Sequence, residues 1–550
     1  MRNTAFLVGV SILIFFSGCK NGKKENAVTQ DSTMKKKIEQ FAEVELNYDI
    51  SKFSEKDKKI LSILFDVADI MDELFWDQTF GLDKKKQVLD TLKDELARKY
   101  FFINYGPWER LNDNKPFLAG FGEKPLGANY YPADMTKEEF EKFQDENKNS
   151  QYTLLRRDEK GQLKVVWYHE AYKDQLQKAH DLLLQAAELT DNPHFKKYLQ
   201  LRAKALITSD YFESDMAWMD MKDNLFDFIV GPIENYDDHL FEKKTSFESF
   251  ILIKDLDWSK KLEKYVKVLP DLQKQLPVDE KYKKEKPGSS SDMNVYYVLY
   301  YAGDCNAGSK TIAINLPNDE RVQLQKGTRK LQLKNAIHAK FDKILVPIAE
   351  QLIDSTQLSM VIFDQFFNNV MFHEVSHGLG IKYVVGTKTP VRDALKETYS
   401  TIEECKADIG GLFIIQKLRE MGLITEGTME QNYITYVAGI FRSVRFGAAS
   451  AHAKANLLAF NHFIKKGAVE RKENEKYFIH VDKMPEAVES LLNKILTIQG
   501  DGNYEAAKKW LEKDAVMPDF MKKDLEKVNQ SGIPVDIIFK QGKSVVGLKS

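Results

Sequence analysis

The amino-acid sequence predicts a mostly helical α+β protein whose strands cluster in the middle of the chain. Two long stretches, residues 38–229 and 336–496, carry apolar side chains at the three- and four-residue spacing of amphipathic helices. Between them, residues 250–253, 295–301 and 311–316 are short runs rich in β-branched and aromatic residues, which is typical of strands. A chain of 550 residues is expected to form about three or four domain-sized units.

The composition excludes several classes of protein. Apolar residues make up 43% of the chain, and 34 Phe and 23 Tyr supply ample core material, so a long disordered chain is excluded. Only the extreme N-terminus holds a sustained apolar run, which excludes a multi-span membrane protein. The formal net charge of −2 provides no electrostatic argument for nucleic acid as the main partner.

The N-terminal residues have the layout of an export signal. A short positive end precedes an apolar run over residues 5–16, and Ser17-Gly18-Cys19 follows. This resembles the lipobox of a bacterial lipoprotein, which predicts a signal peptide over residues 1–18 and a lipid on Cys19. Residues 19–37 then form a polar, Lys-rich tether. We expect a protein of the cell envelope, lipid-anchored on the periplasmic or the surface face. The alternative is an ordinary secretory signal with an incidental Cys.

Local signals place several further elements. Thr136-Lys137-Glu138-Glu139 predicts the start of a short helix, and residues 105–117 and 281–292 predict loops. Residues 361–372 are apolar enough for a buried helix, and residues 395–418 read as one helix. Apart from Cys19, only Cys305 and Cys405 are present, so the core rather than disulfides must stabilise the fold. We expect no bridge between them, although the sequence does not determine their oxidation state.

The strongest chemical signal is His373-Glu374-Val375-Ser376-His377, an HExxH motif. The four-residue spacing places both imidazoles on one helix face, where they can bind a single Zn²⁺, with Glu374 beside the metal to polarise water. Random matches in a chain of this composition number about 0.01. The alternative is a pair of core histidines with a neighbouring surface Glu.

A third zinc ligand is predicted 27 residues beyond His377, in the run from Glu403 to Asp408. Glu404 and Asp408 are one turn apart, so one carboxylate can bind zinc while the other accepts a hydrogen bond from a ligand imidazole. Cys405 points about 100° away from Glu404 around the helix and is a poorer candidate. The alternative for this run is a solvated acidic face.

A further histidine, His452, lies among small residues in Ala451-His452-Ala453-Lys454-Ala455-Asn456. Spacing alone leaves a structural or a catalytic role open. The sequence contains no serine nucleophile elbow, phosphate-binding loop or dinucleotide fingerprint.

The motifs HEVSH and EECKAD together resemble those of the dipeptidyl peptidase III family, zinc exopeptidases whose better-known members carry one extra residue in the first motif. The resemblance implies two lobes around a wide cleft: a helical, zinc-bearing upper lobe and a lower lobe with a small β-barrel core. We therefore expect residues 38–335 to form mainly the lower lobe and residues 336–550 mainly the upper lobe.

Two more segments are similar to the substrate-binding motifs of that family, Ile233-Glu234-Asn235-Tyr236 and Ile314-Asn315-Leu316-Pro317-Asn318. The resemblance implies that Glu234, Asn315 and Asn318 bind the free α-amine and first backbone of a peptide. It also implies that Tyr236 and His452 stabilise the developing oxyanion. Asn456 stands where familiar members carry an Arg that recognises substrate.

The resemblance completes a predicted site. It comprises the zinc ligands His373, His377 and Glu404, the base Glu374, and the imidazole-orienting carboxylates Glu403 and Asp408. The expected function is release of dipeptides from the N-termini of short peptides by a monomeric enzyme with one Zn²⁺. Alternatives are another gluzincin-type aminopeptidase or oligopeptidase, or a lipoprotein that binds peptides without cleaving them. A nudix-type hydrolase is disfavoured, because the sequence has no nudix box.

Overall fold

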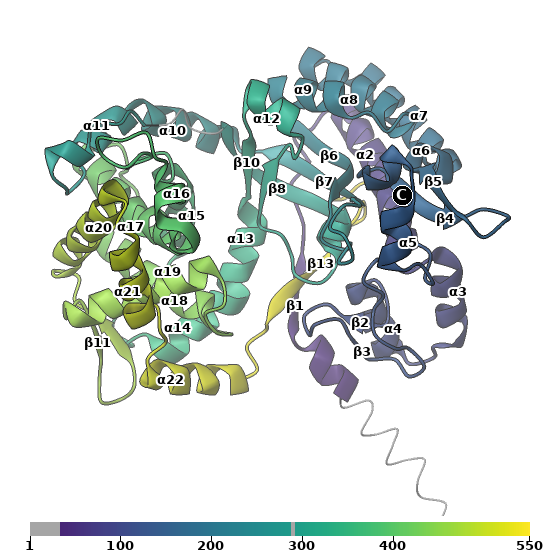
Figure 1. Ribbon diagram of the computed structural model, residues 1–550. Coiled ribbons are helices and arrows are strands. Elements are labelled where there is room, and N and C mark those ends of the chain that lie inside the picture. The colour runs from purple at the N-terminus through teal and green to yellow at the C-terminus, as the bar shows by residue number, and fades with distance from the viewer. Residues whose placement is uncertain (1–32, 288–291, 550) are drawn as a thin grey trace, which may run out of the picture.

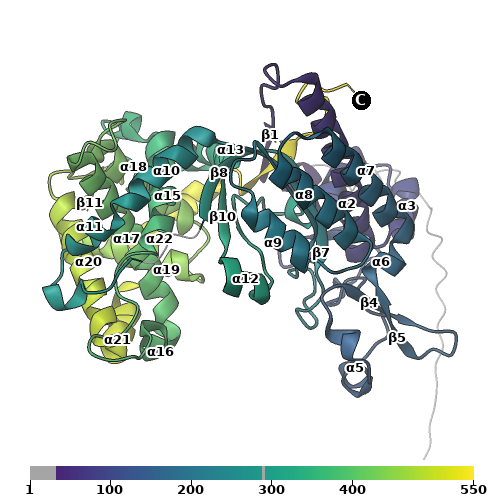
Figure 2. The ribbon, with the colours of Figure 1, turned by 90° about the horizontal axis from the view of Figure 1, so that it is seen from above.

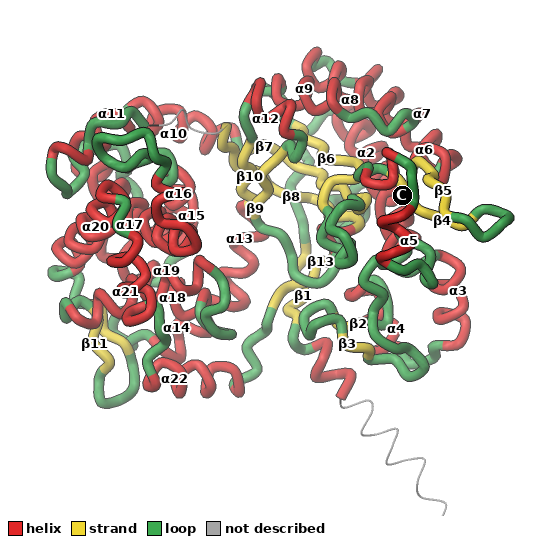
Figure 3. The backbone as a smooth tube through the Cα atoms, viewed as in Figure 1, coloured by secondary structure: helices red, strands yellow, loops and turns green. Residues whose placement is uncertain are grey.

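The computed structural model describes residues 33–287 and 292–549, and the chain forms two lobes with separate apolar cores (Figure 1). One core is built from side chains of residues 262–533, and the other from residues 46–336 together with Val546. Strands gather in the second lobe, while helices make up nearly all of the first (Figure 3). The two-lobe, mostly helical expectation is confirmed. The predicted signal peptide, Cys19 and most of the tether lie outside the described residues. The tether expectation is wrong for residues 33–37, which are helical and bury Met34.

The sheet lobe is organised by five strands in the order β6-β7-β8-β10-β9. Their bounds are β6 Phe226–Glu234, β7 Ser246–Lys254, β8 Asp292–Gly303, β9 Ala313–Leu316 and β10 Arg329–Leu333. The sheet is mixed, because β10 pairs in parallel with β8 and antiparallel with β9. It curls as a half-barrel with β6 and β9 at its edges, rather than closing into a barrel.

The predicted strands are confirmed in β7, β8 and β9, but two strands of this sheet, β6 and β10, were not predicted, nor were the strand pairs outside it. The helical expectation for residues 226–229 is wrong, because they begin β6. Gly231 and Pro232 lie within this strand, and in the sequence the pair indicates a turn instead. The short β10, Arg-Lys-Leu-Gln-Leu, has too few apolar residues to produce a strand signal.

Helices cover the sheet on one side, with α2 packed on β7 and β8, α7 packed on α2, and α8 packed on α7 (Figure 2). Ser54 caps α2 through a reciprocal hydrogen-bonded box, and Thr136 caps α5 as predicted. The elements of this lobe outside the central sheet are β1 Phe41–Glu45, α2 Glu55–Thr79, α3 Leu82–Thr91, α4 Glu95–Asn104, β2 Trp108–Glu109, β3 Lys115–Pro116, α5 Lys137–Lys142, β4 Thr153–Arg157, β5 Leu163–Trp167, α6 Tyr168–Ala171, α7 Lys173–Leu189, α8 Pro193–Leu206, α9 Phe212–Asp220 and α12 Glu320–Lys326.

One long helix, α17, lies at the centre of the helical lobe and packs against α15, α19 and α20. The expected single helix over residues 395–418 is wrong at its start, because a 3-10 turn, Lys396–Thr398, precedes α17 and Lys396 has a φ of +51°. The elements are α13 Lys334–Lys340, α14 Val346–Leu352, α15 Phe363–Ser376, α16 Val391–Leu395, α17 Tyr399–Glu420, α18 Met429–Ser443, α19 Ala451–Lys465, β11 Val469–Arg471, β12 Tyr477–Ile479, α20 Met484–Asp501, α21 Tyr504–Asp514 and α22 Asp519–Gln530.

Two segments cross the expected boundary at residue 335. Helices α10 (Leu256–Lys267) and α11 (Leu269–Lys274) connect β7 to β8 yet place Leu262 and Leu272 in the core of the helical lobe. Strand β13 (Asp536–Lys540), near the C-terminus, returns to pair in parallel with β1. The pairing of β1 with β13 joins residues almost 500 positions apart, so no local sequence pattern indicates it. None of the helices formed by the described residues has the length and apolarity that a bilayer span requires.

Candidate metal centre

Helices α15 and α17 approach each other backbone to backbone, and two glycines permit this. A Cβ on Gly411 would lie 3.0 Å from the backbone nitrogen of His373, and a Cβ on Gly410 would lie 2.2 Å from Oγ of Ser376. Both distances are too short for a real side chain to be tolerated without a shift. The close approach brings the carboxylates of α17 within reach of the imidazoles of α15.

Three predicted ligands converge at this contact. Oε2 of Glu404 lies 3.2 Å from Nε2 of His373 and 3.8 Å from Nε2 of His377, and one ligand atom from each residue lies within 4.8 Å of the others. Two imidazole nitrogens and one carboxylate oxygen form a donor set that suits a catalytic zinc ion. The residues present therefore fit the predicted metal.

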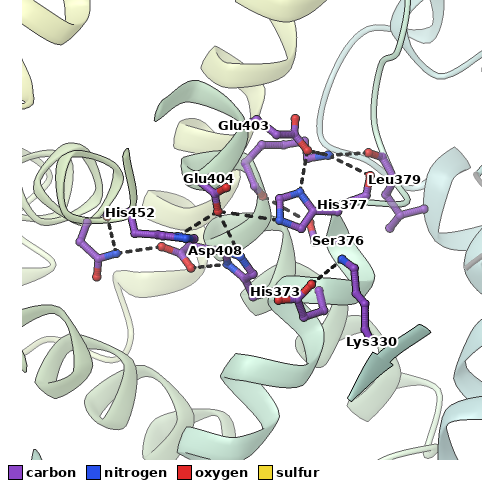
Figure 4. Close-up of polar contacts among 12 residues, drawn as sticks. Lys330, His373, Ser376, His377, Leu379, Glu403, Glu404, Asp408 and His452 are labelled. Atoms are coloured by element: carbon purple, nitrogen blue, oxygen red, sulfur yellow. Dashed lines mark hydrogen bonds and ion pairs between the residues drawn. The ribbon is translucent and has the colours of Figure 1, made fainter. Parts of the chain in front are cut away.

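Two further carboxylates hold the imidazoles from behind (Figure 4). Nδ1 of His373 lies 2.7 Å from Oδ1 of Asp408, and Nδ1 of His377 lies 2.8 Å from Oε1 of Glu403. Because each Nδ1 is engaged by a carboxylate, both Nε2 atoms are left to face Glu404. Although burial opposes protonation, the Asp408 and Glu404 carboxylates raise the pKa of His373 to about 10. The carboxylates therefore stabilise positive charge at this imidazole.

Glu374 lies between the two histidines on α15, and its carboxylate is paired with a residue that sequence reasoning missed. Nζ of Lys330, on β10, lies 2.5 Å from Oε2 of Glu374. Although burial opposes ionisation, Lys330 and His373 hold the pKa of Glu374 below its ordinary value. Lys330 lies 44 residues before Glu374 in a mixed polar run, so no motif marks it.

Helix α19 contributes His452 and Asn456 to the same cluster. Nδ1 of His452 lies 3.0 Å from Oε2 of Glu404, and its side chain is 63% exposed. The side-chain amide of Asn456 points to Asp408, to which Nδ2 donates over 3.1 Å. The structure thus brings together all the predicted residues of the helical lobe.

The remaining predicted residues form a second group in the sheet lobe. Glu234, Tyr236, Asn315 and Asn318 line a cavity of about 680 Å³ beside the edge strand β9. Asn318 donates to the carbonyl of Ile233 over 3.2 Å. Burial raises the pKa of Glu234, against the hydrogen bonds from Asn318 and Tyr236. Within the described parts of the chain, no hydrogen bond or ion pair joins these four side chains to the imidazole cluster.

Two other carboxylates line this cavity without having been predicted, those of Glu248 and Asp304. Glu248 is 3% exposed, and burial raises its pKa well above the ordinary value. A signal for Glu248 was present in the sequence, since it is the one acidic residue in the apolar run that became β7. Asp304 follows β8 in a turn and carries no comparable signal.

Two lobes with a His-His-Glu cluster on packed helices are typical of a metallopeptidase, and comparison with known proteins supports this class. Residues 142–389 match Peptidase family M49. The structure of dipeptidyl peptidase III from Caldithrix abyssi is 43% identical and has a TM-score of 0.85. The match covers 93% of this chain and 100% of that one. That from Corallococcus sp. strain EGB is 36% identical with a TM-score of 0.71, over 93% of this chain and 97% of that one.

A curated relative, Nudix hydrolase 3 of Arabidopsis thaliana, is 34% identical over 577 residues, which span 93% of this chain and 74% of that protein. The solved dipeptidyl peptidase III structures match almost end to end, in sequence as well as in fold. The chain belongs to the dipeptidyl peptidase III family, peptidase family M49, and is a peptidase.

Proposed function

We propose that the protein is a zinc-dependent exopeptidase that releases dipeptides from the N-termini of short peptides. The observation that carries the proposal is the convergence of His373, His377 and Glu404 within 4.8 Å, with Glu374 on the same helix. Zinc bound there would act as a Lewis acid that polarises the scissile carbonyl.

The side chains of the cluster have distinct roles in this proposal. Glu374 takes a proton from the attacking water and later passes it to the leaving amine. Glu403 and Asp408 fix the orientation of the two ligand imidazoles. His452 donates a hydrogen bond to the carbonyl oxygen as negative charge develops on it, and Tyr236 joins it from the sheet lobe.

The cavity beside β9 sets the cleavage position. Glu234 pairs with the α-ammonium group of the peptide, while Asn315 and Asn318 bind its first backbone amides. A blocked amine loses the ion pair and leaves a partly buried carboxylate without its partner, which is costly. The geometry therefore favours peptides with a free N-terminus.

Product analysis tests this function. The purified chain from residue 20 onward is incubated with short peptides, half of them N-acetylated, beside the Glu374→Ala variant, and products are read by mass spectrometry. We expect N-terminal dipeptides from the free peptides only, and none from Glu374→Ala, which should retain its metal. Single-residue or internal cleavage would instead indicate another gluzincin-type peptidase. Bound zinc without any cleavage would favour a peptide-binding lipoprotein.

The anchor is a separate proposal that rests on residues 5–16 and Ser17-Gly18-Cys19 alone. We propose that Cys19 carries the lipid and holds a monomeric enzyme at a bacterial membrane in the cell envelope. More than one acyl chain is needed for stable anchoring. Intact-mass measurement of the membrane-extracted protein should show an acylated Cys19, and an unmodified residue would contradict the proposal.

A further inference from the structure

An ion pair crosses from the sheet lobe to the helical lobe at the candidate site. Nζ of Lys330 on β10 lies 2.5 Å from Oε2 of Glu374 on α15. The two side chains are 23% and 22% exposed, so the pair is only partly screened by solvent. Figure 4 shows Lys330 reaching from its strand toward the helix that carries His373.

Lys330 also has a defined relation to the cavity beside β9. It is the direct cross-strand partner of Asn315 in the antiparallel pair of β9 and β10. Residues directly opposite each other in such a pair project from the same face of the sheet. Asn315 lines the cavity that also holds Glu234. Lys330 therefore stands between the proposed amine-binding residues and the proposed base.

We propose that Lys330 is a positioning residue that ties the Glu374 carboxylate to the strand pair presenting Asn315. This inference rests on the proposed function and deepens it. The backbone of α15 places Glu374 beside the histidines but leaves its side-chain torsions free, so a fixed partner determines where the carboxylate lies. Because Lys330 belongs to the strand pair that binds the peptide, the Glu374 carboxylate keeps a constant position relative to the bound peptide.

The position of a base affects the rate steeply, since a displacement of about 1 Å can cost about 100-fold. The contact by itself does not recognise the peptide. Loss of Lys330 should therefore lower kcat and leave KM nearly unchanged. The side chain touches none of the predicted metal ligands in the contacts of the described residues, so metal content should also stay the same.

The test uses Lys330→Met, Lys330→Arg and the matched control Lys334→Met. Lys334 is four residues away and has its own carboxylate partner, Asp255, at 3.0 Å. We expect Lys330→Met to lower kcat about tenfold or more with KM within about threefold of the parent value, and Lys330→Arg to recover most of the loss. Lys334→Met should behave like the parent. Unchanged kcat in Lys330→Met, or a change confined to KM, would overturn the inference.

A second measurement does not depend on turnover. The melting temperatures of Lys330→Met, Glu374→Gln and the double variant form a double-mutant cycle. If the ion pair ties the lobes, the decrease in melting temperature of the double variant is smaller than the sum of the decreases in the two single variants. Strictly additive losses would reject the tie even in an active enzyme. Non-additive losses in a protein that cleaves no peptide would reject the proposed function and leave the tie standing.

Discussion

The side-chain amide of Asn456 donates a hydrogen bond to Asp408, with 3.1 Å between Nδ2 and Oδ2, while Oδ1 of the same carboxylate lies 2.7 Å from Nδ1 of His373. The amide also donates to the carbonyl of His452 over 2.9 Å. Asn456 thus lies behind the metal cluster, whereas the sequence suggested a contact with substrate. This geometry links α19 to α15 through one carboxylate on α17.

We predict that Asn456→Ala weakens metal binding. Without the amide, Asp408 loses a donor that fixes its orientation toward His373, and outer partners of this kind affect metal affinity about 10–100-fold. Chelator competition measures the change. Asn461→Ala is the matched control, since Asn461 lies on the same helix and donates to the carbonyls of Asp514 and Val516. Unaltered metal affinity with a raised KM would instead restore the substrate-binding role.

We predict that His452→Ala lowers kcat far more than it changes KM. A donor aimed at the developing oxyanion acts in the transition state, and removing one typically costs about 100–1,000-fold in kcat. His462→Ala should leave kcat unaffected, because His462 lies on the same helix and contacts the hydroxyl of Ser490. A defect seen only in KM would argue against the role of His452 in the transition state.

We predict that Gly411→Ala separates α15 from α17. The new Cβ would lie 3.0 Å from the backbone nitrogen of His373, so the backbone of α15 would have to move away by a few tenths of an ångström. Overpacking of this kind destabilises by about 1–3 kcal/mol, and the variant should also retain less zinc. Gly439→Ala on α18 provides the control, since its nearest contact would be an ordinary 3.8 Å to Phe366. Equal stability and zinc content in both variants would contradict the close approach.

We predict a pH-dependent contribution from Lys244 to stability. Burial lowers the pKa of Lys244 to about 7 in the folded chain, well below its unfolded value of 10.5. Between these values the unfolded state binds more protons, so this contribution to the unfolding free energy rises with pH from about 7 to about 10.5, by at most about 1.4 kcal/mol per unit. Below pH 7 both states are protonated and the contribution stays constant.

Denaturant unfolding of Lys244→Met at several pH values measures this contribution. The variant should become progressively less stable relative to the parent as the pH rises from 7 to 9. Lys243→Met removes a neighbouring charge that helps to lower the pKa of Lys244, so its stability should rise with pH somewhat less than that of the parent. Parallel stability curves for Lys244→Met and the parent would show that the ammonium group stays charged, held by its hydrogen bonds to the carbonyls of Lys148 and Ser150.

The chemistry of the helical lobe was predictable because helix periodicity is a local property. The four-residue spacing of His373 and His377 places both on one face of α15 wherever that helix lies in the fold. The same reasoning placed Glu404 and Asp408 on one face of α17. Cys405, expected to point elsewhere, is a buried free thiol, as is Cys305.

Tertiary structure alone decided which of these faces meet and which side chains from other elements join them. Gly410 and Gly411 determine the distance between α15 and α17, and β10 brings Lys330 to Glu374 across the lobes. The sequence by itself determined the residue types of the metal cluster, because short spacings dictate local geometry. It could not determine the contact of Lys330 with Glu374, the place of Asp304 in the cavity or the pairing of β1 with β13, because those contacts join distant segments that only the packed core holds together.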